Sequence, residues 1–222
     1  MPNCNLAVKV SREPRVFAPD LPGNLDAAAH PELRGDHHGL LFTSLPESLD
    51  ASHSTIVECR FATPPVRELT LRGATLTDVE FDDFQATQVG GRQSTWRNVR
   101  VAGGRIAALD LSAASLDSVE LRGLRIDYLN LSAAKVADVI ITDCRIGTLD
   151  LPGATLTRVR FDDSTADEVD SRESRLQHVD LRGLSVARFL DVAALRGAIM
   201  TPAQVELYAA QFAAALGVDV RD

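Results

Sequence analysis

Nearly every fifth residue from Ile56 to Val186 is apolar, and the phase is kept over the whole stretch. An amphipathic helix places apolar residues three and four positions apart, and a half-buried strand places them two apart. A sustained period of five fits neither element, so the chain must turn at short and regular intervals. Internal periodicity of this kind identifies a repeat architecture and constrains the fold more than any local pattern.

A finer signal shows that the structural repeat is twenty residues, made of four fives. The phrase Leu-x-Leu-Ser-Ala-Ala opens at Leu109 and again at Leu129. Every fourth repeat also places valine two residues before the fifth position, at Val79, Val99, Val119, Val139, Val159 and Val179. A chain with four short sides per turn stacks equivalent residues about 4.8 Å apart. We therefore predict that these valines form an interior ladder, as do Leu111, Leu131 and Leu151.

Composition is consistent with such an interior. Hydrophobic residues make up 45% of the 222 residues and aromatic residues only 5%, so we expect a core of Leu, Val, Ile and Ala. A period of five that arose by accident from a leucine-rich composition would not produce a column of valines alone.

The pattern resembles the pentapeptide-repeat family, whose loose consensus is A-(D/N)-L-x-x. The best matches are Leu-Asp-Leu at 109–111, Ala-Ser-Leu at 114–116, Leu-Asn-Leu at 129–131 and Leu-Asp-Leu at 149–151. The resemblance covers residues 54–188 and implies an all-β fold, a right-handed quadrilateral β-helix with four five-residue faces per turn. Many positions carry Val, Leu, Arg, Thr or Ser where the family has Ala, Asp or Asn, so its charge pattern is not carried over.

Three regions are expected along the chain. Residues 1–53 form an irregular, extended N-terminal segment and cap, residues 54–190 form the β-helix, and residues 191–222 form a helical C-terminal cap. Thr201 to Gln204 reads as a capping box with proline at the first helical position, and Gly217 is a natural stop. We predict one helix over about Pro202 to Leu216 that covers the last turn. The resemblance implies an alternative use for this helix, which is dimerisation, so the chain is expected to be a monomer or a C-terminal dimer.

The N-terminal segment is harder to interpret. Its first 40 residues are rich in Pro, Asp and Ala, and we expect extended chain packed along or under the first turn. His37 and His38 follow Asp36, with His30 nearby, which raises the question of a metal site. No further ligands recur at zinc-like spacing, so a solvated loop is the preferred interpretation and no metal is predicted.

Catalysis is not expected. The sequence contains no glycine-rich phosphate loop, nucleophile elbow or metalloprotease motif, and Cys144 occupies an inward position typical of a core residue. No cofactor is predicted. Three cysteines, the absence of a signal peptide and the absence of a long apolar segment favour a cytoplasmic protein with no membrane contact. The net charge of −8 argues against direct binding to nucleic acid.

The outward positions are the candidate interaction faces. One face stacks Arg105, Arg125 and Arg145, which we interpret as a solvated ladder in preference to an anion-binding strip. Other faces stack acidic residues, at Asp110, Asp150 and Asp170 and at Asp162 with Asp163. The sequence therefore predicts a non-enzymatic scaffold that presents flat faces to a protein partner of unknown identity. The alternative, implied by the resemblance, is a DNA mimic that binds DNA gyrase and protects it from fluoroquinolones.

Overall fold

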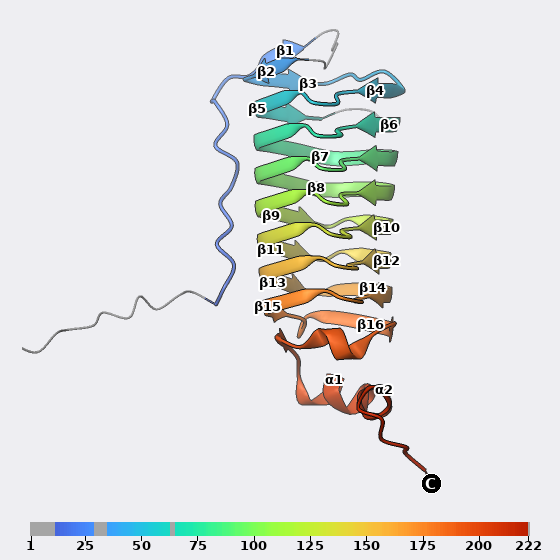
Figure 1. The fold of residues 1–222 in the computed structure, drawn as a ribbon. Helices are drawn as coiled ribbons and strands as arrows, with labels where there is room; N and C mark the ends of the chain where they lie inside the picture. Colours follow the sequence, from blue (N-terminus) through green and yellow to red (C-terminus); the bar gives the residue numbers. More distant parts are fainter. Residues whose placement is uncertain (1–11, 29–34, 63–64, 222) are drawn as a thin grey trace, which may run out of the picture.

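The structure, a computed structural model, describes residues 12–28, 35–62 and 65–221. It is a mostly β, parallel solenoid of about 8 turns, drawn in Figure 1 as a stack of rungs that ends in two short helices. The predicted all-β solenoid is thereby confirmed. Within the described ranges, no helix is long and apolar enough to cross a membrane.

The strands of the first half are β1 (Asp26–Ala28), β2 (Asp36–His38), β3 (Leu40–Phe42), β4 (Ser48–Asp50), β5 (Thr55–Phe61), β6 (Val66–Thr70), β7 (Thr75–Gly90) and β8 (Thr95–Asp110). Those of the second half are β9 (Ser115–Arg122), β10 (Arg125–Asn130), β11 (Lys135–Thr142), β12 (Arg145–Asp150), β13 (Thr155–Asp162), β14 (Ser164–Asp170), β15 (Arg175–Asp180), β16 (Leu184–Phe189) and β17 (Ala198–Ile199). The helical elements are η1 (Val192–Leu195), α1 (Pro202–Leu207) and α2 (Ala209–Ala215).

The strand register repeats the sequence period. Through the middle of the stack, each strand pairs in parallel with residues twenty positions before and after it, so Val139 lies between Val119 and Val159. Arg125 lies between Arg105 and Arg145 in the same way. Twenty residues therefore make one turn, as predicted, and every position belongs to a column of equivalent residues along the stack.

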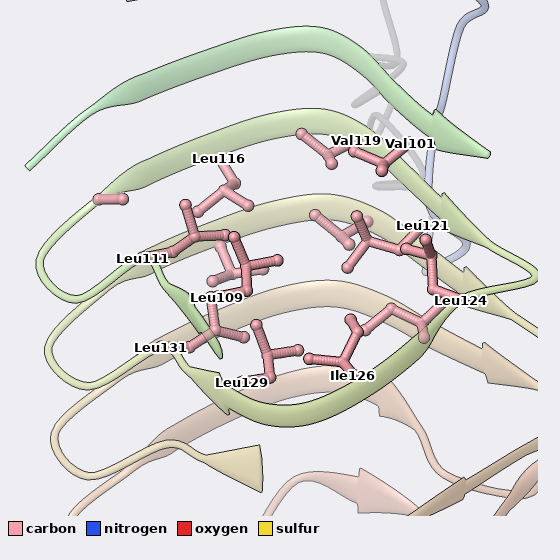
Figure 2. Packing of buried hydrophobic residues seen from close by; sticks show 14 of the residues in the cluster. Val101, Leu109, Leu111, Leu116, Val119, Leu121, Leu124, Ile126, Leu129 and Leu131 are labelled. Carbon is pink, nitrogen blue, oxygen red and sulfur yellow. The ribbon is translucent and has the colours of Figure 1, made fainter. Parts of the chain in front are cut away.

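The interior is a set of apolar columns. All six valines of the predicted ladder are at most 2% exposed, and Leu111, Leu131 and Leu151 are buried with them. Figure 2 shows Leu109 above Leu129 and Leu111 above Leu131 on successive turns. At about 25 cal/mol per Å² of buried apolar surface, these repeated columns are the main source of stability.

Most of the chain's few aromatic rings also lie in the interior, whereas the sequence predicted a core of aliphatic residues. Phe42, Phe61 and Phe81 stack with ring centroids 4.6 Å apart, close to the spacing of parallel strands. Phe84 meets Phe81 edge-on at 5.1 Å, and Trp96 lies 6.3 Å from Phe81. The aromatic stack concentrates the largest side chains in the turns nearest the N-terminus.

The corners of the stack use left-handed backbone. Left-handed residues form three columns, and neighbouring columns are five residues apart in the sequence. Within each column the residues are twenty positions apart. Glycine, asparagine and aspartate tolerate this conformation best, and the columns contain many of them. The first column is His53, Gly73, Gln93, Ala113, Ala133, Gly153 and Glu173; the second is Glu58, Asp78, Asn98, Ser118, Asp138, Arg158 and His178; the third includes Asp83, Gly103, Gly123, Asp143 and Asp163.

The C-terminal cap differs from the single helix predicted. The chain forms α1 and α2, which break at Tyr208, where the backbone leaves helical geometry (φ −101°, ψ 11°). Tyr208 is buried and meets the Phe189 ring edge-on at 5.0 Å, and its hydroxyl donates to the Val186 carbonyl. This inward contact of one side chain replaces the continuous apolar helix face that the sequence predicted, and most of the other apolar side chains of α1 and α2 remain accessible.

The predicted capping box is present and serves the stack as well. Thr201 accepts from the Gln204 backbone N–H, and the Gln204 side chain accepts from the Thr201 N–H. The amide nitrogen of Gln204 also donates to the carbonyls of Leu181 and Leu184, at 2.8 and 2.9 Å. The Gln204 side chain thus caps the start of α1 and also satisfies two carbonyls of the last turn.

The N-terminal part contributes to the sheet before residue 54. β2 and β3 pair with β5, and β4 pairs with β6. His37 and His38 lie on β2, so the predicted solvated loop is wrong. Residues 12–20, here called the strap, run as extended chain along the outside of the stack from the level of β15 towards β2 (Figure 1). The strap therefore crosses several turns, instead of packing along or under the first one as predicted.

Candidate functional site

The predicted arginine ladder lies on one wall of the stack. We call this the arginine wall, and it consists of two outward columns, two residues apart on each strand: Gln85, Arg105, Arg125, Arg145 and Thr165, with Thr87, Ala107, Asp127, Gly147 and Asp167. The three arginines are exposed, and strand periodicity places residues i and i+2 on the same face.

An acidic residue that sequence reasoning missed relieves most of the repulsion in this ladder. Asp127 Oδ2 accepts from Arg105 at 2.8 Å, and Asp127 Oδ1 lies 3.7 Å from Arg125. The hydrogen bond from Arg105 holds the pKa of Asp127 below its usual value. Arg145 makes no ion pair with any residue in the described ranges. The spacing of Arg125 and Asp127, two apart on one strand, was the available signal.

Two open hollows lie along the arginine wall. One, of about 420 Å³, is bordered by Arg125, Arg145 and Asp167, with Gly147 at its floor. The other, of about 340 Å³, lies beside Arg105 and Ala107. Both occur where the second column has a glycine or alanine, so the wall is indented and not flat. Exposed guanidinium groups around such an indentation can hydrogen-bond carboxylates in a bidentate manner.

The acidic column Asp110, Asp150 and Asp170 is used by the fold. Asp110 and Asp170 accept the backbone N–H two residues later, at 3.0 and 3.1 Å, which fixes the turn that follows. Asp150 precedes Pro152, which has no N–H, and it accepts instead from the Tyr128 hydroxyl. This hydrogen bond raises the pKa of Tyr128 to about 12.

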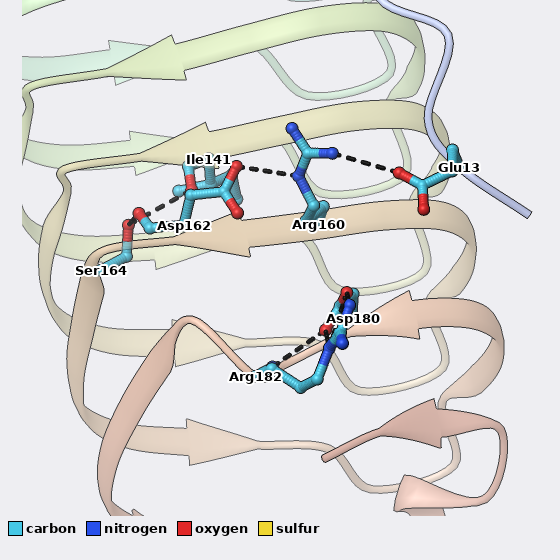
Figure 3. Close-up of polar contacts among 7 residues, drawn as sticks. All are labelled: Glu13, Ile141, Arg160, Asp162, Ser164, Asp180 and Arg182. Atoms are coloured by element: carbon cyan, nitrogen blue, oxygen red, sulfur yellow. Dashed lines mark hydrogen bonds and ion pairs between the residues drawn. The ribbon is translucent and has the colours of Figure 1, made fainter. Parts of the chain in front are cut away.

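The remaining acidic candidates are paired or sit at corners. Asp162 accepts from Arg160 at 2.8 Å, and Arg160 also reaches Glu13 of the strap at 3.2 Å (Figure 3). Asp163 is one of the left-handed corner residues, with φ +47°. Asp170 is almost fully buried and bonded by Arg172, which lowers the pKa of Asp170. The predicted acidic ladders are therefore not a free negative surface.

Opposite charges also alternate along a column that the sequence analysis did not identify. Arg60, Glu80, Arg100 and Glu120 follow one another at twenty-residue steps. Arg60 donates to Glu80 at 2.6 Å, and Arg100 donates to Glu120 at 2.8 Å. Reading every twentieth residue outside the apolar columns would have revealed it.

The other residues weighed for chemistry are structural. Cys144 is fully buried and its thiol points at the carbonyls of Leu121 and Thr142, and burial raises its pKa to about 11. His37 meets the Phe42 ring edge-on, and His38 lies 3.2 Å from Glu58. His30 lies outside the described residues.

Across the described ranges, no three His, Cys, Asp or Glu side chains come together as metal ligands would. Comparison of the chain with protein-family models and with curated proteins gives no match.

Proposed function

We propose that this protein is a non-enzymatic scaffold of the pentapeptide-repeat type, which binds another protein on an outer wall. Three observations support the type: inward residues at every fifth position, left-handed corners at five-residue steps, and a twenty-residue turn. Four fives per turn are consistent with a right-handed quadrilateral cross-section.

The observation that carries the proposal is the arginine wall. The strand register fixes the backbone positions of its arginines at regular intervals, and the Arg145 side chain has no ion-pair partner in the described ranges. The hollow beside Gly147 is lined by Arg125, Arg145 and Thr165 and also by two aspartates, Asp127 and Asp167. A partner whose carboxylates enter this hollow would find preorganised donors, since the wall is part of a rigid sheet.

The test compares two charge reversals of equal size on different walls. The double variant Arg125→Glu with Arg145→Glu alters the arginine wall, and Lys135→Glu with Arg175→Glu alters exposed residues elsewhere on the stack. Partner proteins captured from the native cell are identified for the wild type and then tested against both purified variants. Only the first variant should lose the partner, with both melting within ~2 °C of wild type. Equal binding by both variants would contradict the proposal.

The alternative, gyrase-directed DNA mimicry, requires a nearly continuous negative stripe. The acids are instead interrupted by bonded arginines, as in Arg172 with Asp170 and Arg158 with Asp138. This pattern favours the scaffold. A supercoiling assay separates the two: inhibition of gyrase at equimolar protein, or its protection from a fluoroquinolone, would establish mimicry instead.

Dimerisation through the C-terminal helices stays the alternative to simple capping. Val205, Leu207 and Leu216 are 47%, 71% and 81% exposed, and such residues are available to a second copy. Sedimentation velocity on the wild type and on Leu207→Glu decides the matter. If both proteins are monomers, the helices only cap the stack. If the wild type is a dimer and Leu207→Glu is a monomer, the helices form the dimer interface.

A further inference from the structure

The strap is held by side chains of one corner column. The backbone N–H of Arg15 donates to Asp138 Oδ1 at 2.9 Å, and that of Phe17 donates to Ser118 Oγ at 2.9 Å. Further along, the N–H of Asp20 donates to Asp78 Oδ1 at 3.0 Å. The three acceptors all have left-handed backbone and belong to the same column.

In these hydrogen bonds the strap contributes backbone N–H groups, so the bonds do not depend on the identity of its side chains. Arg15 and Phe17 bond to residues twenty apart, so two strap residues span one turn. Phe17 and Asp20 bond to residues forty apart, so the next three strap residues, Pro19 among them, span two turns and pass Asn98, the corner residue in between. Proline has no N–H to offer, and Asn98 donates instead to Asp78 at 3.1 Å. The corner column therefore accepts backbone N–H groups of an extended chain at three of its turns, from Arg15, Phe17 and Asp20.

Side chains add a second, weaker requirement. Pro14, Val16 and Pro19 are half-buried, whereas Phe17 is 65% exposed. Two prolines and a valine thus face the stack, while Phe17 and Ala18 project away. At the far end, Glu13 forms an ion pair with Arg160 at 3.2 Å, which fixes the direction in which the chain runs.

The strap can leave without breaking the sheet. Its hydrogen bonds go to side chains and its residues belong to no strand, so no ladder bond opens when it detaches. Its ion pair to Arg160 is largely exposed, and such pairs contribute little to stability. The covered surface remains in place, because the sheet on either side of it is fixed by pairing between turns.

We propose that the corner column formed by Asp78, Ser118 and Asp138 is a docking site for an extended peptide, occupied in cis by the strap. The inference rests on the proposed scaffold function and gives it a second surface. The partner segment is extended and carries proline or a small aliphatic residue at the positions facing the column. It also carries a carboxylate near Arg160. Tethering gives the strap an effective concentration in the millimolar range, so the docking site becomes available only to a segment that competes with the strap.

The first experiment tests whether the corner side chains hold the strap. Trypsin cleavage after Arg15 is followed by mass spectrometry in the full chain and in Ser118→Ala, which removes one acceptor. Ser115→Ala, on an exposed site in the same turn, is the matched control. Cleavage should be about five to ten times faster in Ser118→Ala and unchanged in Ser115→Ala. Equal rates in the two variants would overturn the proposal.

The second experiment tests whether the docking site binds a separate peptide. Phe17→Pro removes the N–H that Ser118 accepts, and Ala18→Pro places the same ring at a residue whose N–H bonds to nothing in the described ranges. The probe is a fluorescent peptide of residues 12–21, with and without an N-methyl group on Phe17. Full-length Phe17→Pro should bind the plain peptide at least fivefold more tightly than wild type or Ala18→Pro.

Methylation of the peptide should abolish that gain. Equal binding by wild type and Phe17→Pro, or equal binding of both peptides, would overturn the proposed docking site. Neither outcome bears on the arginine wall, since no native partner enters these assays, and the failure of one proposal is therefore distinguishable from that of the other.

Discussion

Adjacent residues on one strand of this solenoid face different environments. Val139 is 2% exposed and stacked between two other valines, whereas Ile140 is half-buried in an outward column next to Arg160. Successive side chains of a strand point to opposite faces, so one points inward and the next outward, and the twenty-residue register repeats this alternation on every turn. The cost of a substitution therefore depends on the column it enters.

Val139→Asp places an unpaired carboxylate inside the ladder and should cost about 3–5 kcal/mol of unfolding free energy. Ile140→Asp is the control, because the same side chain one position on meets water and Arg160 and should change stability by less than about 1 kcal/mol. Thermal denaturation of both variants measures the difference. Equal melting temperatures would contradict the inward assignment of the valine column.

Asp138 connects strap docking to pH. Burial opposes its ionisation, but hydrogen bonds from Arg158 and from the Arg15 N–H prevail and hold the pKa of Asp138 below its ordinary value. A depressed folded pKa contributes stability that is present above the unfolded pKa of about 3.9 and is lost as the pH falls through the folded value.

The amide resonance of Arg15 should therefore titrate with a midpoint below about 3.9. In Asp138→Asn the same resonance should be nearly independent of pH, because the amide does not ionise. NMR spectra between pH 7 and 2.5 provide the measurement. A midpoint above that of an ordinary aspartate would mean that burial prevails over the hydrogen bonds.

At the scale of elements, the last turn shows how an open sheet end is closed. η1 buries Val192 and Leu195, and Asp191 caps it by accepting from the Ala193 N–H at 2.9 Å. α1 then brings Gln204 against the carbonyls of Leu181 and Leu184. An unprotected edge would expose apolar residues and unpaired backbone groups, which favours edge-to-edge association.

Gln204→Leu keeps most of the side-chain volume but removes the amide. The variant should lose about 1–3 kcal/mol, because two carbonyls and the Thr201 N–H lose their partner. Gln211→Leu on α2 is the control, since the Gln211 side chain has no hydrogen bond in the described ranges. Hydrogen exchange should accelerate selectively in β15 and β16 of the first variant. Uniform protection in both would show that another residue closes the end.

The fold was predictable from sequence to the extent that it repeats. The valine column alone required a twenty-residue turn, and the Thr201 capping box located the start of α1. The break at Tyr208 was missed because its cause is tertiary: the ring turns towards Phe189 and its hydroxyl towards Val186. A helical pattern of apolar residues does not reveal which of those residues contacts a distant part of the chain.

The candidate site was less predictable because its determining contacts lie between columns or far apart in the chain. The arginine ladder was found, but the role of Asp127 depends on which carboxylate reaches which guanidinium. Extended N-terminal chain was predicted, but its path across several turns was not: Arg15 and Asp138 are 123 residues apart, and the bond between them involves a backbone N–H. Nothing in an aperiodic segment encodes such a contact locally.

At the scale of the whole molecule, the stack is nearly one-dimensional. Each turn pairs with its two neighbours, so stability accumulates turn by turn, as in other solenoids. The strap is the exception, because it binds residues from several turns at once. It couples turns that otherwise have no contact.

Removal of one complete turn should therefore be tolerated, whereas a smaller removal out of phase should not. Deletion of residues 149–168 joins Thr148 to Val169, which lies in the column of Leu149. Deletion of residues 149–166 is two residues shorter but brings Asp167 into that interior column. Circular dichroism melts should show cooperative unfolding for the first and none for the second. Similar melts would mean that turns are not the structural unit.

From Arg15 to Asp20 the strap advances five residues while it crosses three turns of the stack, and this ratio has an evolutionary consequence. A duplication that adds a turn lengthens the rod by about 4.8 Å. The strap must then gain residues by a separate change in the N-terminal segment. Otherwise its N–H groups no longer lie opposite the corner residues that accept them. The length of the stack and the length of the strap must therefore change together, although each change requires its own mutation.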